Sequence, residues 1–237
     1  MNGLLVRAGI DQEAGRWNGP VDPRSAEFVY VPRPETAEDS VRVRPQYRRS
    51  YQEIVQALGR MGVALPRHLN DDCMHLDPDF EHLTYGDKRK KAQRIGGLVD
   101  GDMIGFYAGL RPTVPGPDPL LYALIGVYFV REIVPATLVP RALWHENAHT
   151  RREPFDDEII VRAKESTSGR LERCIPIGEY RNRAYRVRHP MLEAWAGLSV
   201  NDGWIQRSAV PPSFNDCDRF LHWLNGQGVP LVRRNNP

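Results

Sequence analysis

The chain has 237 residues, of which 41% are hydrophobic and 26% are charged, and this composition excludes disorder over the whole chain. The net charge of +2 is too small to indicate a dedicated nucleic-acid-binding domain, although arginines cluster locally. Three cysteines, Cys73, Cys174 and Cys217, argue against a disulfide framework and favour a reducing compartment.

Strands and helices are located by the spacing of hydrophobic residues. Strands are predicted at residues 4–10, 27–31, 101–110, 120–134, 158–163, 170–176 and 185–188. Helices are predicted at residues 47–61, 88–95, 141–152 and 214–224. Strands outnumber helices and short turns connect them. We therefore expect one α+β domain over residues 1–237, with helices packed around a strongly bent, mostly antiparallel sheet or a small barrel.

The longest apolar stretch, residues 120–130, is shorter than the roughly 20 residues that a membrane span needs. The apolar run near the first residue is too short for a signal peptide. We therefore expect a cytoplasmic protein that does not act at a membrane.

A glycine-rich loop follows the first predicted strand, and Arg7 and Asp11 lie where that strand ends. Glycines let a backbone approach a ligand closely. Trp17 offers a stacking surface, and Asn18 carries a donor and an acceptor for a base edge. The loop therefore predicts base binding by Arg7, Trp17 and Asn18, with Asp11 as a catalytic acid. The alternative is an ordinary turn-rich loop.

An acidic segment at residues 71–87 holds six carboxylates, two histidines and one thiol. Crowded carboxylates raise one another's pKa and can then act as general acids near neutral pH. The candidate catalytic residues are Cys73, His75, Asp77 and Asp79, with Cys73 as a nucleophile if a neighbour lowers its pKa. The alternative is a solvated acidic loop.

The sequence His145-Glu146-x-x-His149 matches the pattern of zinc peptidases. On one helix, residues four apart share a face, so both imidazoles could bind one zinc ion with Glu146 as the base. His149 is therefore a candidate catalytic residue and metal ligand. Two alternatives remain open: a surface helix, or a phosphate contact through Asn147, Arg151 and Arg152.

A last candidate segment contains Trp204, Gln206 and Arg207. In an extended chain, Trp204 and Gln206 point to one side, which suits stacking on a base and reading its edge. The alternative is a tryptophan that packs in the core.

Taken in order, several of these segments resemble the nucleotide modification associated domain 3 family. The similar pieces are residues 4–11, 15–23, 28–35, 75–79, 85–87, 147–152, 170–173 and 203–208. The resemblance implies a part in bacterial and phage DNA hypermodification, and it supplies no established catalytic residue. The central strands, residues 101–107 and 124–128, are also similar to the PUA, ASCH and EVE group of small bent barrels, which hold modified bases in a pocket.

The resemblance favours an enzyme that acts on DNA carrying a modified base, beside other enzymes of a base-modification cluster. Our concrete expectation is hydration of the nitrile of a 7-cyano-7-deazaguanine base to the carboxamide. Cys73 could add to the nitrile with no cofactor, or a zinc ion at His145 and His149 could activate water. The alternatives are a non-catalytic PUA-like reader of a modified base and a zinc-dependent hydrolase of small substrates.

Overall fold

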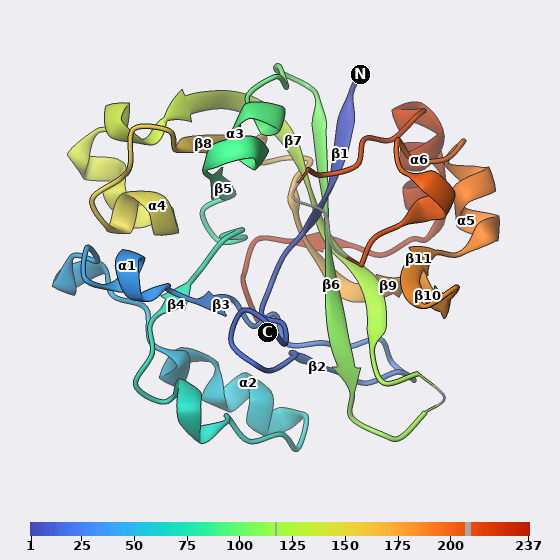
Figure 1. Ribbon diagram of the computed structural model, residues 1–237, viewed down its shortest axis with the longest axis horizontal. Coiled ribbons are helices and arrows are strands. Elements are labelled where there is room, and N and C mark those ends of the chain that lie inside the picture. Colours follow the sequence, from blue (N-terminus) through green and yellow to red (C-terminus); the bar gives the residue numbers. More distant parts are fainter. Residues whose placement is uncertain (117, 207–209) are drawn as a thin grey trace.

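The computed structural model describes residues 1–116, 118–206 and 210–237. Helices and two small two-stranded sheets surround one eight-stranded mixed sheet (Figure 1). The strands are β1 (Gly3–Arg7), β2 (Pro20–Val21), β3 (Arg33–Pro34), β4 (Met74–His75), β5 (Thr84–Asp87), β6 (Met103–Pro112), β7 (Leu121–Pro135), β8 (Ile159–Ala163), β9 (Gly169–Pro176), β10 (Gly178–Arg181), β11 (Ala184–Val187) and β12 (Leu231–Val232). The α-helices are α1 (Ala37–Ser40), α2 (Val55–Arg60), α3 (Arg89–Ile95), α4 (Ala148–Arg151), α5 (His189–Ala194) and α6 (Cys217–Gly226). Short 3₁₀ segments cover Pro45–Tyr47, Tyr51–Ile54, Arg67–Leu69, Ala136–Leu138, Arg141–Glu146 and Asn201–Gly203.

The eight-stranded sheet is organised by the β6–β7 hairpin. β1 and β2 pair with β6 in parallel, whereas β9 and β8 pair with successive parts of β7 in antiparallel fashion. Register shifts in the β7 pairings, between Leu124 and Gly126 and between Val130 and Glu132, are the kind of irregularity that bends a sheet. The sheet does not close into a barrel. The predicted α+β fold is therefore confirmed, in its open-sheet form.

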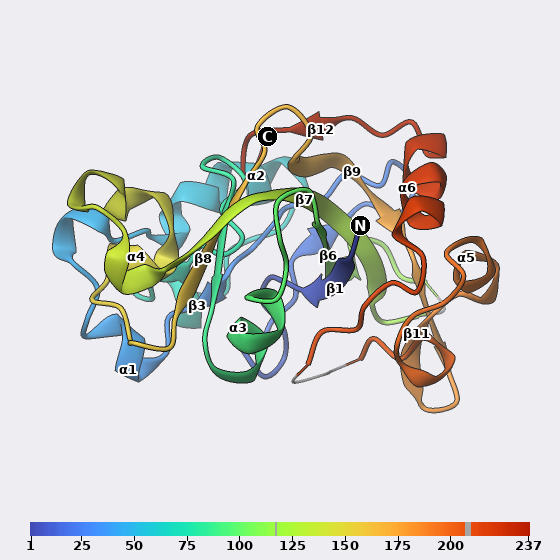
Figure 2. The same ribbon diagram turned by 90° about the horizontal axis from the view of Figure 1, so that it is seen from above.

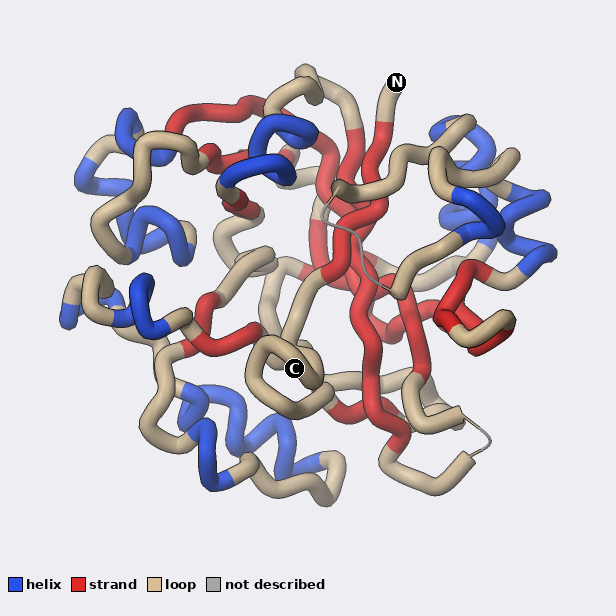
Figure 3. The backbone as a smooth tube through the Cα atoms, viewed as in Figure 1, coloured by secondary structure: helices blue, strands red, loops and turns tan. Residues whose placement is uncertain are grey.

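Both faces of the sheet are buried, as the two-residue period of strands requires. Leu4 and Val6 of β1 join a cluster with Phe106, whereas Leu5 faces a second cluster with Trp195 and Phe220. The second cluster takes residues from α5 and α6, which lie together on one side of the molecule (Figure 2). The helices lie at the periphery and the strands at the centre (Figure 3).

The predicted elements at residues 47–61 and 27–31 differ from the structure for local reasons, and so does the helix predicted at residues 141–152, which is interrupted at Asn147. The helix predicted at residues 47–61 is α-helical only in α2, because Ser50 and Glu53 form a capping box that starts a 3₁₀ segment. Residues 28–31 of the strand predicted at residues 27–31 are buried, but they join no ladder beyond a bridge at Phe28. Instead, the side-chain amide of Asn236 forms hydrogen bonds with the backbone N–H and the backbone carbonyl of Tyr30, both at 2.8 Å.

In the described part of the chain, no helix combines the length and the apolar character that crossing a bilayer requires.

Candidate active site

Two buried histidines from distant segments meet at one carboxylate. His75 ends β4, Asp77 follows it in the loop before β5, and His149 lies in α4. The Nε2 atoms of His75 and His149 lie 3.8 Å and 3.4 Å from Oδ2 of Asp77. The two imidazole rings are 4.9 Å apart and nearly perpendicular. The structure therefore brings together three of the predicted catalytic residues.

Each imidazole is oriented by a carboxylate at its other nitrogen. Nδ1 of His75 lies 2.9 Å from Oε2 of Glu35, and Nδ1 of His149 lies 2.8 Å from Oε1 of Glu158. A carboxylate accepts a hydrogen bond, so in both rings Nδ1 carries a proton, and in the charged form of His149 Nε2 carries a second one. Both Nε2 atoms are then directed toward Asp77.

Asp77 is held through its other oxygen. The backbone N–H of Gly86 donates to Oδ1 at 2.9 Å, and the side-chain amide of Asn147 donates to the same atom at 3.1 Å. Asn147 also caps α4, because its Oδ1 accepts from the backbone N–H of His149. One asparagine thus fixes both the carboxylate and the helix that carries His149.

Gly86 of β5 allows the close approach of His149. A Cβ at this position would lie 2.5 Å from Cδ2 of His149 and 2.9 Å from Oδ1 of Asn147. Gly86→Ala is therefore expected to displace His149 and to cost about 1–3 kcal/mol by overpacking. Urea denaturation will measure the cost. The matched control is Gly59→Ala in α2, where nothing lies within 4 Å, and we expect it to stabilise by about 0.5–1 kcal/mol. Equal effects of the two substitutions would contradict this account.

The cluster opens into a cavity of about 310 Å³. The lining residues are Arg7, Ala8, Gly9, Arg33, His75, Asp77, Tyr85, Gly86, Asp87, Lys88, Lys91 and His149. Three of its cations are paired: Lys88 with Asp39 at 3.2 Å, Lys91 with Asp87 at 3.7 Å and Arg7 with Asp11 at 3.3 Å. Arg33 has no carboxylate within 4.0 Å among the described residues, so its charge is available to an anionic ligand.

The His75 side of the cluster favours uncharged groups. Burial, reinforced by the charges of Arg33 and His149, lowers the pKa of His75 well below its usual value. Burial raises the pKa of Glu35 to about 7. His75 is therefore a neutral imidazole near neutral pH.

On the other side of the cluster, His149 and Glu158 favour their charged forms, whereas Asp77 does not. Burial alone lowers the pKa of His149, but hydrogen bonds to Asp77 and Glu158 outweigh it and raise the pKa to about 9. Burial raises the pKa of Glu158, but contacts with His149 and Arg152 outweigh it and lower the pKa to about 2. Burial also raises the pKa of Asp77. The cluster thus holds both acidic and basic groups around one point.

The predicted zinc pair His145–His149 is wrong in its geometry. The chain leaves helical geometry at Asn147, which has φ −142° and ψ 150° between the 3₁₀ segment and α4. The two imidazoles therefore do not share a helix face. His145 packs against His82, with ring centres 5.3 Å apart, whereas His149 faces Asp77.

The phosphate contact predicted for Arg151 and Arg152 is also wrong, because both side chains are buried in ion pairs. Arg151 contacts Asp79 at 2.5 Å, and Arg152 pairs with Glu158 and lies 3.4 Å from Asp39. These arginines stabilise the segment behind the cavity. The side-chain amide of Asn147 likewise forms its hydrogen bonds within the protein.

Cys73 and Asp79 do not line the cavity. Cys73 is buried, and burial raises its pKa, which is the opposite of what an activated nucleophile needs. Its backbone carbonyl accepts from the N–H of Glu35 at 2.9 Å and so positions that carboxylate. Burial raises the pKa of Asp79, but His82 and Arg151 outweigh it and hold the pKa well below its usual range.

The glycine-rich loop reaches the cavity through Arg7 alone among its predicted residues. Asp11 pairs with Arg7 at 3.3 Å and accepts two backbone N–H groups of its own turn. Asn18 is buried and donates to the carbonyl of Gly109 at 2.8 Å, so it does not read a base edge. Trp17 packs beside the cluster of α2.

The last candidate segment meets the loop at Arg7, which donates to the backbone carbonyl of Gln206. The side-chain oxygen of Gln206 accepts from the N–H of Tyr185, and Trp204 is 37% exposed beside Arg186. Neither residue lines the cavity. Arg207 lies outside the described residues.

Sequence reasoning missed Glu35, Glu158 and the cation Arg33. Glu35 and Arg33 lie in a segment that the family resemblance includes, so that resemblance was a usable signal. Glu158 precedes β8 by one residue and gives no local signal, because its role depends on contacts made by folding.

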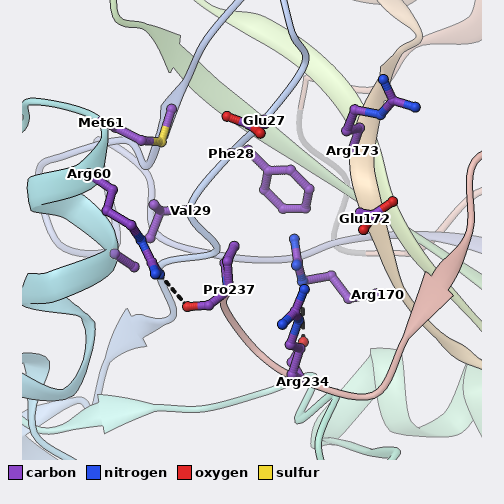
Figure 4. Close-up of a pocket in the computed structure, with 11 residues that line it drawn as sticks. Glu27, Phe28, Val29, Arg60, Met61, Arg170, Glu172, Arg173, Arg234 and Pro237 are labelled. Carbon is purple, nitrogen blue, oxygen red and sulfur yellow. Dashed lines mark hydrogen bonds between the residues drawn. The ribbon is translucent and has the colours of Figure 1, made fainter.

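A second cavity, of about 460 Å³, lies between α2, β9 and the C-terminal segment (Figure 4). Arg60 donates to the carbonyl of Pro237, and Arg170 donates to the carbonyl of Arg234 at 3.2 Å. Arg170 also stacks over Phe28. The lining contains no histidine or cysteine. These arginines hold the C-terminal segment in place.

Fold and site together define an α+β protein with a buried histidine–carboxylate cluster at the floor of a cationic cavity. The family model for nucleotide modification associated domain 3 matches residues 2–209, so the chain belongs to this family. The match confirms the resemblance seen in the sequence and associates the protein with DNA nucleotide modification. All the residues of the cavity fall within the matched range. No curated protein and no solved structure matches the chain.

Proposed function

We propose that the protein is an enzyme that alters a modified base in DNA, and that the reaction takes place at His75, Asp77 and His149. The observation that carries the proposal is the convergence of two oriented imidazoles on one carboxylate, at the floor of a cavity. Such groups move protons to and from a substrate. Family membership supports modified DNA as the class of substrate.

The reaction that we propose is hydration of the nitrile of a 7-cyano-7-deazaguanine base to the carboxamide. The oxygen of one water molecule bonds to the nitrile carbon, and one of its protons is transferred to the nitrile nitrogen. The resulting imidic acid tautomerises to the amide, with no oxidant or reductant. Because no cysteine lines the cavity, water rather than Cys73 is the nucleophile in this proposal. A water that enters the cavity at the cluster would meet Asp77 and both imidazoles.

The size of the cavity supports a single base as the ligand. At about 310 Å³ it lies at the lower end of the range of about 300–1,000 Å³ for ligand pockets. A duplex cannot enter such a space, so the base must leave the stack, as in other enzymes that act on bases in DNA. The lining cations, Arg33 among them, are then placed to contact the phosphates that flank the base.

The test is expression in a host whose DNA carries the cyano-deazaguanine base, followed by digestion to nucleosides and mass spectrometry. The expected result is a gain of one water in that nucleoside. An unchanged mass together with tight binding of the modified DNA would show that the protein is a non-catalytic reader and not an enzyme. An unchanged mass without binding would overturn the choice of substrate.

Arg33→Gln is expected to weaken binding of modified DNA about 10-fold, because its unpaired charge is lost from the cavity. The slope of log affinity against log salt should fall by about 1, as for the loss of one phosphate contact. Fluorescence anisotropy at several salt concentrations measures both quantities. Arg24→Gln, at an exposed arginine that does not line the cavity, is the control and should change neither. Equal slopes for wild type and Arg33→Gln would exclude the phosphate contact.

A further inference from the structure

We propose that His75, Asp77 and His149 bind one divalent first-row transition metal ion, through Nε2, Oδ2 and Nε2. This inference deepens the proposed function and rests on it in taking the same cavity as the reaction site. The three ligand atoms lie within 4.8 Å of one another, and all three side chains are buried. Two imidazoles and one carboxylate are a ligand set typical of catalytic zinc and non-haem iron.

The spacing of the ligand atoms suits an ion among them. Ligands about 2.1 Å from a tetrahedral ion are about 3.4 Å apart. The observed separations from Oδ2 of Asp77 are 3.4 Å and 3.8 Å, longer than an ordinary hydrogen bond of about 2.9 Å. An ion therefore requires only a slight contraction of the cluster.

The surroundings of the ligands provide a second, independent observation. Metal-binding histidines usually donate their other N–H to a carboxylate, which fixes the ring and strengthens it as a ligand. Both histidines have such a partner here, Glu35 at 2.9 Å and Glu158 at 2.8 Å. Oδ1 of Asp77 accepts from the Gly86 N–H and from the Asn147 amide, the Gly86 N–H also reaches Oδ2 at 3.1 Å, and Oδ2 is the oxygen that faces both imidazoles.

The charges around the cluster of His75, Asp77 and His149 distinguish it from a second group of possible metal ligands nearby. Asp79, Glu81 and His82 also lie close enough for a metal, but Arg151 contacts Asp79 at 2.5 Å and already neutralises it. Among the described residues, no lysine or arginine lies within 4.0 Å of the Asp77 carboxylate. The side chains that face Oδ2 of Asp77 are two imidazoles, and a metal ion bound among these three groups would supply positive charge to the buried carboxylate.

The ion would have only three protein ligands, so further coordination positions would face the cavity. Three ligands plus open positions are the pattern of catalytic rather than structural sites. Bound there, a divalent ion would supply Lewis-acid activation of water for the proposed hydration. Glu35 and Glu158 are positioning residues, since they act through the histidines.

The test uses the full chain, freed of metal by a chelator and titrated with Zn²⁺ by calorimetry without DNA. We expect one Zn²⁺ per chain. Asp77→Asn should weaken binding at least about 100-fold, since loss of an outer partner alone costs about 10- to 100-fold. Glu35→Gln should weaken it about 10-fold while the melting temperature of the metal-free protein stays unchanged. His145→Gln is the control, a histidine outside the cluster, and should bind as tightly as wild type.

The inference is overturned if wild type binds no Zn²⁺, or if His145→Gln weakens binding and Asp77→Asn does not. Failure of this inference can be told from failure of the proposed function. If chelated protein still hydrates the base, the metal site is excluded from the reaction and the proposed enzyme function stands. If the protein binds one Zn²⁺ per chain but leaves the base unchanged, the metal site stands and the proposed substrate is wrong.

Discussion

Asp77→Asn is expected to lower turnover of the modified base at least about 100-fold, the lower bound for a positioned acid–base group. Asparagine has the shape of aspartate and can still accept hydrogen bonds from Gly86 and Asn147 through one oxygen. In that orientation its amide nitrogen faces the two Nε2 atoms. It can neither take a proton from water nor serve as an anionic ligand. The measurement is the time course of nucleoside mass in the cyano-deazaguanine strain.

Two controls make the result specific to this carboxylate. Glu81→Gln changes an exposed acid of the same loop and should leave turnover unchanged. Cys73→Ala removes the thiol once expected to act as nucleophile and should retain turnover, because Cys73 does not line the cavity. If Cys73→Ala abolishes turnover in a folded protein and Asp77→Asn does not, the site has been wrongly assigned.

Most of the fold could be predicted because its central strands carry a strong local signal. β6 and β7 are long and apolar, and the strands predicted at residues 101–110 and 120–134 are both present and pair with each other. Elements that depend on distant partners could not be found in this way. β4 and β5 are short, and their partners, β3 and β8, lie far from them in sequence.

The residue types of the candidate site could be predicted from the sequence, but which of these residues contact one another could not. The acidic loop pointed to His75 and Asp77, and the zinc-peptidase pattern pointed to His149, but to the wrong partner. That pattern assumes a continuous helix, whereas Asn147 adopts an extended conformation and caps α4. An asparagine side chain can compete with helical hydrogen bonds in this way, and spacing alone does not reveal it.

Arg152→Met is expected to destabilise the protein by about 3–5 kcal/mol, the usual cost of removing one partner from a buried ion pair. Arg152 is fully buried, pairs with Glu158 and lies 3.4 Å from Asp39. Methionine fills much of the space but leaves two buried carboxylates without that charge. Urea denaturation near neutral pH measures the loss. The control, Arg233→Met, breaks an exposed pair with Glu165 and should cost less than about 1 kcal/mol.

The pH dependence of the same two proteins tests whether charge, rather than packing, causes this loss. Burial raises the pKa of Asp39, but the charges of Arg152 and Lys88 and the Thr36 hydroxyl outweigh it and lower the pKa below its usual value. A carboxyl with a lowered pKa in the folded state stabilises the fold above its unfolded pKa, about 3.9. That contribution is lost as the pH falls through the folded-state pKa. In Arg152→Met the folded-state pKa should rise, so the penalty should shrink as Asp39 becomes protonated. A penalty that stays constant from neutral to acidic pH would assign the role of Arg152 to packing alone.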